Sequence, residues 1–88
     1  MDGDGERKMK IYWHNDQKNI IGKNVRLLRK NLKMTQKELA NKLQLLGYEF
    51  DRLTIVRIES GDRFVADYEV KALSEALVVD ISSLYADK

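Results

Sequence analysis

Cysteine and proline are absent from the 88-residue chain, and histidine occurs once, at position 14. Without thiols the fold has neither disulfides nor a thiolate metal site, and one imidazole cannot hold a zinc ion alone. We therefore expect no metal and no cofactor. No apolar run approaches the length of a membrane span or of the core of a secretion signal. We expect a soluble, cytoplasmic protein with no membrane partner.

Motifs of catalysis are also missing from the sequence. It contains no G-x-S-x-G elbow, no G-x-x-x-x-G-K-[ST] loop and no G-x-G-x-x-G turn. The carboxylates fall mostly at expected helix starts and outer faces, where capping explains them. A small helical bundle also rarely has room for the concave pocket of an active site. We expect no catalytic residues and no small-molecule ligand.

What the chain does contain favours a single all-α domain. Helix-forming Leu, Lys, Glu, Ala and Arg are abundant, and 43% hydrophobic residues support a modest core. Residues 1–18 lack periodicity, and Gly3 and Gly5 among charges suggest a flexible N-terminal segment. Residues 19–88 form the expected folded domain.

Charge is unevenly distributed along this domain. Residues 19–63 carry ten basic and five acidic side chains, whereas residues 64–88 carry two basic and five acidic ones. From Lys18 to Lys37 there are seven cations and no anion. This asymmetry favours one face turned toward a polyanion, although a solvated lysine-rich helix would have the same composition.

The central stretch, residues 35–63, reads as two short helices joined by a turn. Thr35 and Glu38 have the spacing of a capping box, followed by a face of Leu39, Ala40, Leu43 and Leu46 that ends at Gly47. Asp51 is suited to cap a second helix, in which Ile55 and Ile58 face inward and after which Gly61 acts as a stop. Two long cations, Arg52 and Arg57, fall on the outer face.

These residues resemble the helix-turn-helix of the Cro/C1-type, lambda-repressor-like DNA-binding domains (the XRE family). The matching residues are Thr35-Gln36-x-Glu38-Leu39-Ala40 and Thr54-Ile55-x-x-Ile58-Glu59-Ser60-Gly61-x-Arg63. The similarity runs from about residue 20 to about residue 85. It implies a five-helix bundle over residues 19–88 and a sequence-specific, repressor-like transcriptional regulator.

The resemblance also implies roles for individual residues. The base-reading positions fall on Arg52, Leu53, Val56 and Arg57 of the second motif helix. The alternative for Arg57 is an ion pair with a nearby acidic residue, and the alternative for Arg52, at the start of the helix, is a phosphate contact. The phosphate-binding candidates are Thr35, Gln36, Lys37, Thr54 and Arg63. Arg29 and Glu59 match a structural ion pair that joins the first helix to the third.

Further helices flank the motif. A stripe of Ile21, Val25, Leu28 and Leu32 predicts a helix over 20–32. Residues 64–78 predict a fourth helix, with Asp67 or a neighbour as its cap and Val65, Val70, Leu73 and Leu77 inward. Asp80 is expected to cap a last short helix from which Ile81, Leu84 and Tyr85 pack back.

The sequence departs from the family pattern at two places. The turn between the motif helices is about five residues longer, and some of Leu45, Leu46, Tyr48 and Phe50 should pack beneath the recognition helix. Val78 stands where the family has Gly. Because Val resists a positive φ, we expect the fourth helix to end less tightly or to run on.

The expected partner is double-stranded DNA with two-fold related half-sites, bound by a homodimer. The last helix with Tyr85 and the apolar residues 11–13 are both candidates for the dimer surface. The alternative is a protein-interaction module on the same fold with weak or non-specific DNA binding, because Leu53 and Val56 are apolar.

Overall fold

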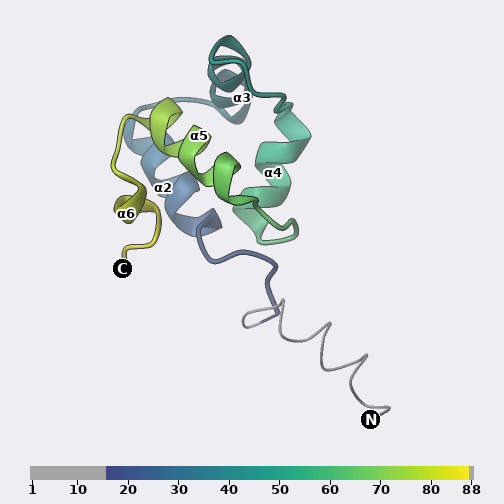
Figure 1. The fold of residues 1–88 in the computed structure, drawn as a ribbon, viewed down its shortest axis with the longest axis vertical. Coiled ribbons are helices and arrows are strands. Elements are labelled where there is room, and N and C mark those ends of the chain that lie inside the picture. The colour runs from purple at the N-terminus through teal and green to yellow at the C-terminus, as the bar shows by residue number, and fades with distance from the viewer. Residues whose placement is uncertain (1–15, 88) are drawn as a thin grey trace.

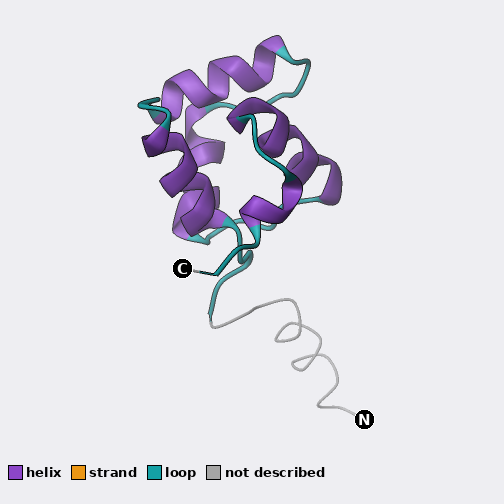
Figure 2. Ribbon diagram, turned by 90° about the vertical axis from the view of Figure 1, so that its left-hand side faces the viewer, coloured by secondary structure: helices purple, strands orange, loops and turns teal. Residues whose placement is uncertain are grey.

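The structure of the protein is a computed structural model, which describes residues 16–87. The apolar residues 11–13 and His14, and most of the expected N-terminal segment, lie outside that range. The described chain is all-helical, as predicted, with five helices and no strand (Figures 1 and 2). They are α2 (Gly22–Asn31), α3 (Gln36–Leu45), α4 (Arg52–Ser60), α5 (Asp67–Leu77) and α6 (Ile81–Leu84).

The helix ends of the central motif follow the sequence signals. The N–H of Glu38 donates to the Thr35 hydroxyl (3.0 Å), and the N–H of Thr35 donates to the Glu38 carboxylate (2.8 Å), which completes the capping box. Asp51 caps α4 by accepting from the N–H of Thr54 (2.8 Å). Gly61 ends α4 with a φ of 80°. All three predictions are confirmed.

One core is shared by all five helices. α4 packs against both α2 and α3, α5 closes the other side against α2 and α3, and α6 lies against α2 and α5 (Figure 1). The buried residues of this core are Ile21, Val25, Leu39, Ala40, Leu43, Phe50, Ile55, Ile58, Val70, Ala72, Leu73, Ala76, Leu77 and Leu84. Leu32, predicted on the inner stripe, is instead 46% exposed, because α2 ends at Asn31 and the chain turns away.

Helix α2 approaches α4 closely at its first residue. A methyl group placed on Gly22 would lie 2.1 Å from the carbonyl oxygen of Ile58. Beside this contact, Asn19 donates to the carbonyls of Ile58 (3.1 Å) and Arg63 (2.8 Å) and accepts from the N–H of Gly22 (2.8 Å). The start of α2 is therefore fixed against the end of α4 by backbone contact and by one amide side chain.

The lengthened turn divides its apolar residues. Phe50 is buried and Tyr48 packs partly against the core, as the sequence predicts for some of these residues. Gln44 donates to the carbonyl of Phe50 (2.7 Å) and closes the turn over the end of α3. Leu46 faces solvent with 46% exposure instead of continuing the inner face, and Leu45 is 88% exposed. Gly47 turns the chain with a φ of 96°.

The end of α5 corrects the prediction made for Val78. α5 ends sharply at Leu77, and Val78 adopts the left-handed conformation with a φ of 57°. The N–H of Val79 donates to the carbonyl of Ser74 (3.0 Å), and Val79 packs partly against the core. This hydrogen bond and this packing hold the left-handed turn that a β-branched residue otherwise resists.

The last turn is anchored through α2. Asn24 donates to the carbonyls of Leu84 (2.9 Å) and Ala86 (2.7 Å), and Leu84 is fully buried. Ile81 and Tyr85, both predicted to pack back, are 43% and 48% exposed, because four residues of helix turn only one side inward. Asp80 stands at the N-cap position without a side-chain cap hydrogen bond.

Candidate nucleic-acid interface

The four predicted base-reading residues lie together on the outward face of α4. Arg52 and Arg57 are exposed, Leu53 is 51% exposed, and Val56 is partly buried. Their spacing places them on the side opposite the core residues Ile55 and Ile58, which are fully buried. Neither guanidinium has an ion-pair or hydrogen-bonding partner within residues 16–87.

The start of α3 carries three predicted phosphate ligands. The Thr35 hydroxyl is used in the capping box, whereas the N–H groups of Gln36 and Lys37 have no acceptor within the helix. The side chain of Lys37 is exposed. These features give α3 a positive end, at which free donors point outward.

The predicted ion pair between Arg29 and Glu59 is present and buried. Arg29 Nε donates to Glu59 Oε2 (2.7 Å) and Nη2 donates to Oε1 (3.0 Å), and these side chains are only 8% and 4% exposed. Arg29 Nη1 also donates to the carbonyl of Met34 (2.7 Å). The hydrogen bonds with Glu59 raise the pKa of Arg29 above its ordinary value despite burial.

Gln36 joins this network from α3. Its amide donates to Glu59 Oε1 (3.1 Å), so the side chain predicted to grip a phosphate is oriented by a carboxylate of α4. Together, Arg29, Gln36 and Glu59 connect α2, α3 and α4 behind the outward face.

A groove of about 490 Å³ opens beside this network. It is lined by Arg26, Arg29, Thr35, Gln36, Val56, Glu59 and Ser60. Since Arg29 neutralises Glu59, the unpaired charge in the groove comes from Arg26, for which the structure records no acidic partner in the described chain. The sequence alone did not single out Arg26 as a candidate residue, although it stands one helical turn before Lys30.

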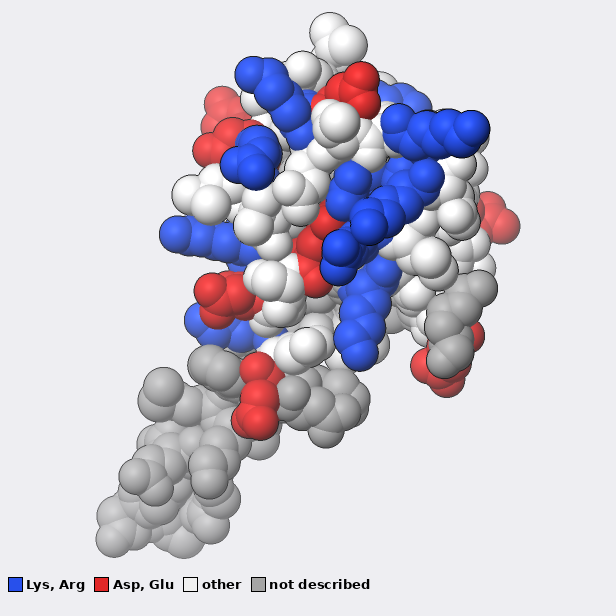
Figure 3. Space-filling model, turned by 180° about the vertical axis from the view of Figure 1, so that it is seen from behind, with Lys and Arg blue, Asp and Glu red and all other residues white. Residues whose placement is uncertain are grey.

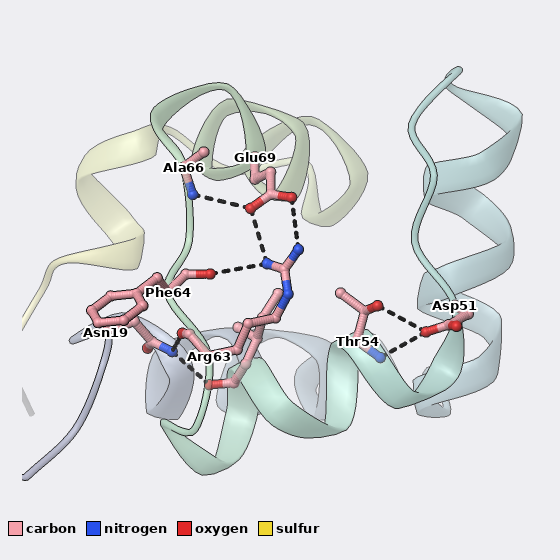
Figure 4. Close-up of polar contacts among 8 residues, drawn as sticks. Asn19, Asp51, Thr54, Arg63, Phe64, Ala66 and Glu69 are labelled. Carbon is pink, nitrogen blue, oxygen red and sulfur yellow. Dashed lines mark hydrogen bonds and ion pairs between the residues drawn. The ribbon is translucent and has the colours of Figure 1, made fainter.

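Thr54 and Arg63 are held by neighbours in the protein. The Thr54 hydroxyl donates to Asp51 Oδ1 (2.8 Å), and the hydrogen bonds from Thr54 lower the pKa of Asp51. Arg63 makes a two-pronged ion pair with Glu69 (2.9 and 3.0 Å) and donates to the carbonyl of Phe64 (3.0 Å), as Figure 4 shows. The predicted phosphate contact of Arg63 thus competes with a pair already formed.

The role of Glu69 was not evident from the sequence. Besides pairing with Arg63, it accepts from the N–H of Ala66 (3.0 Å) and so caps α5, where the sequence suggests Asp67 or a neighbour. The sequence signal for this cap was a Glu at the third position of the helix, from which the side chain can reach back to the backbone N–H of the N-cap residue. The hydrogen bonds from Arg63, followed by the one from Ala66, lower the pKa of Glu69 below its ordinary value.

Among the charged side chains on the face seen in Figure 3, Lys and Arg cover more of the surface than Asp and Glu do. Among residues 16–87, no three His, Cys, Asp or Glu side chains gather as a metal would require. None of the described helices has the length and apolar character needed to cross a bilayer.

Comparison with protein-family models and with curated protein sequences gave no match to this chain.

Proposed function

We propose that the protein is a sequence-specific DNA-binding transcriptional regulator that reads the major groove with α4. The observation that carries this proposal is the outward face of α4, where the guanidinium groups of Arg52 and Arg57 form no hydrogen bond or ion pair within residues 16–87. A surface helix whose cations form no ion pairs among the described residues is suited to a partner that supplies acceptors.

The chemistry of that face suits base edges. A guanidinium can donate two parallel hydrogen bonds to O6 and N7 of guanine, a contact worth roughly 1–3 kcal/mol of discrimination. Leu53 and Val56 have no polar atoms in their side chains but can contact a thymine methyl group. The free N–H groups at the start of α3, with Lys37, would hold a phosphate and fix the position of α4.

The order and capping of the helices support a lambda-repressor-like arrangement, with α3 and α4 as the helix-turn-helix. The turn between them, from Leu46 to Asp51, is longer than the family pattern, and buried Phe50 fixes it to the core. In such domains two copies bind related half-sites. We propose a homodimer on DNA and a repressor-like action through occupation of an operator.

Selection from a pool of randomised duplexes at near-physiological salt tests this function. Wild-type protein should enrich a short, two-fold related site. Arg57→Ala should lose at least one base preference in that site, because its guanidinium is proposed to read a base. Lys71→Ala, which removes an exposed cation from α5, is the matched control and should enrich the wild-type site. An unenriched pool, or identical sites for Arg57→Ala and wild type, would refute base reading by α4.

A protein-interaction module is the second candidate, favoured by exposed apolar residues on α3 and α4. Leu53 is 51% exposed, and Leu45 at the end of α3 is 88% exposed. Salt separates the two functions. Affinity for DNA falls steeply as salt rises because counterions are released, whereas an apolar protein contact is little affected.

A further inference from the structure

A row of cations lies along α2 beside the groove already described. Lys23, Arg26 and Lys30 are all exposed, and their spacing of three and four residues places them on one side of the helix. We call these three residues the α2 ridge. Within residues 16–87, none of them has an acidic partner.

A second groove, of about 670 Å³, runs along this ridge. It is lined by Gln17, Lys23, Arg26, Leu27, Lys30, Glu59 and Ser60. Arg26, Glu59 and Ser60 also line the groove at the start of α3. The two grooves therefore adjoin one another, and their linings together extend from Thr35 at the start of α3 to Gln17.

The charge left without an ion pair along these grooves, among the described residues, is positive. Glu59 is the acidic residue in their lining, and the bonds from Arg29 and Gln36 occupy both of its oxygens. The remaining charged side chains of the lining are those of the ridge. Adjoining grooves whose ridge cations form no ion pair among residues 16–87, and whose one carboxylate is neutralised, fit a chain of phosphates better than a compact ligand.

We propose that the α2 ridge is a second DNA contact, which binds the phosphate backbone beside the bases read by α4. From Lys23 to Lys30 the helix rises about 10 Å, a distance over which one B-DNA strand carries about three phosphates. The contact extends the protein footprint and strengthens binding without adding sequence preference. It rests on the proposed function because it assigns a further surface to the same DNA.

The test compares two pairs of substitutions that remove the same charge. Lys23→Gln/Lys30→Gln removes two ridge cations, and Lys42→Gln/Lys71→Gln removes two cations from α3 and α5. Fluorescence anisotropy of the full chain with a selected duplex gives the slope of log Kobs against log salt. The ridge variant should lower the steepness of this slope by about 2, since each lost phosphate contact contributes about 0.9. The control pair should leave it unchanged.

Phosphate ethylation then locates the contact. Wild-type binding should be weakened by ethyl groups at phosphates next to the selected bases, and the ridge variant should be insensitive to ethylation there. Its enriched sequence should remain that of wild type. Equal slopes for the ridge variant and wild type, or an equal decrease in the control pair, would overturn the proposal.

Failure of base reading can be told apart from failure of the ridge. If no site is enriched, the same slopes are measured on a duplex of arbitrary sequence. A decrease confined to the ridge variant would then support a backbone contact and reject the proposed sequence specificity. Slopes that differ from wild type in neither variant would reject the ridge on any DNA.

Discussion

Arg29 holds three segments together through one buried guanidinium, bonded to Glu59 in α4 and to the carbonyl of Met34 before α3. Replacing it by Met would leave the Glu59 carboxylate buried without a cation. Breaking a buried pair in this way typically costs about 3–5 kcal/mol. We expect Arg29→Met to lower the free energy of unfolding by that amount, measured by urea denaturation.

The free energy of unfolding of Arg29→Met should be compared with that of the double variant Arg29→Met/Glu59→Met. The double variant removes the pair without leaving an unpaired charge, and such replacements are often close to neutral. We expect the double variant to be more stable than Arg29→Met alone. A double variant as unstable as the single one would mean that the Met34 contact, and not the charge pair, dominates.

Glu69 should make stability depend on acidity. The pKa of its carboxyl is lowered from the ordinary 4.5, first by the hydrogen bonds from Arg63, so the folded state binds a proton less readily than the unfolded one. Its contribution to stability is complete above pH 4.5 and is lost as the pH falls through the lowered pKa. With Glu69→Gln, the free energy of unfolding should therefore decrease less steeply as the pH falls into the acid range. We call this acid part of the pH dependence the acid limb.

Urea denaturation at a series of pH values, from strongly acidic to neutral, would measure the free energy of unfolding along this limb. Arg63→Gln should flatten the limb in the same way, since that substitution removes the main cause of the lowered pKa. Asp51 retains its own lowered pKa in both variants, so part of the acid dependence should persist. Variants whose acid limb is as steep as that of wild type would exclude the ion pair as its source.

Individual side-chain roles were only partly predictable. The Arg29–Glu59 pair follows from the family resemblance, because both residues fall on matching motif positions. The resemblance assigns Arg63 to phosphate because its sequence position matches, but a carboxylate six residues away reaches the same guanidinium. A sequence pattern gives the type of side chain at a position, and the competition among its possible partners is decided only by the packed chain.

The contact between α2 and α4 gives a prediction at the level of whole helices. Gly22→Ala would place a methyl group 2.1 Å from the Ile58 carbonyl oxygen, and a backbone atom cannot move aside as a side-chain tip can. The helices must separate, and we expect a loss of about 3 kcal/mol or more in the free energy of unfolding. Gly47→Ala is the control, because open space surrounds that position.

Gly47→Ala should lower the free energy of unfolding only by the cost of a positive φ for a residue with a Cβ, about 1–2 kcal/mol. Thermal denaturation followed by circular dichroism compares the two variants directly. A Gly22→Ala protein no less stable than Gly47→Ala would show that α2 can shift along α4 at little cost. The geometry at Ile58 would then not constrain the helix pair.

Helix α5 offers the opposite case, a position where glycine should help. Val78 takes a φ of 57° at the end of α5 and is 74% exposed, so its side chain gives little burial in return. A left-handed conformation costs a residue with a Cβ roughly 1–2 kcal/mol, and glycine avoids this cost. Glycine also has more conformational freedom in the unfolded chain, which offsets about 0.5–1 kcal/mol of the gain. We expect Val78→Gly to stabilise the protein by up to about 1 kcal/mol in urea denaturation.

Val78→Ala keeps the Cβ and should give a smaller gain than Val78→Gly. If the two variants were equally stable, the left-handed turn would not be the origin of the effect. From the sequence, this valine indicates a loose helix end. That interpretation is wrong because packing of Val79 and one hydrogen bond to Ser74 impose the turn.

The helices and the caps of the central motif were predictable, whereas the caps of α5 and α6 and the exposure of residues at helix ends were not. Thr35, Asp51 and Gly61 act within a few residues of their partners, so local sequence is sufficient to identify them. Leu32 and Tyr85 belong to apolar patterns that continue past the last helical turn. Where a helix stops depends on the neighbour that it meets, and this is a property of the assembled bundle.

The whole domain should become more heat-stable when DNA occupies the proposed face. A ligand that binds only the folded state stabilises it by about 2.7 kcal/mol at a hundredfold excess over Kd. For a domain of this size, about 1 kcal/mol shifts Tm by about 4–8 °C. A selected duplex at that excess should raise Tm by roughly 10–20 °C, measured by differential scanning fluorimetry.

The same duplex should shift Tm much less for Arg52→Ala/Arg57→Ala, and high salt should abolish the shift for wild type. A shift that survives high salt would favour apolar contacts on Leu53 over electrostatic binding. An absent shift at any salt would count against DNA as the partner. The measurement can be made before the contacted bases are identified.

In α4, the residues that hold the fold and the residues proposed to meet DNA are different ones. Ile55 and Ile58 face the core and Glu59 forms the buried ion pair, whereas Arg52 and Arg57 face outward with no hydrogen bond or ion pair from their guanidinium groups within residues 16–87. Selection can therefore act on recognition without endangering folding. A library that randomises positions 52, 53 and 57 should yield mostly folded proteins, from which new target preferences can evolve in single steps.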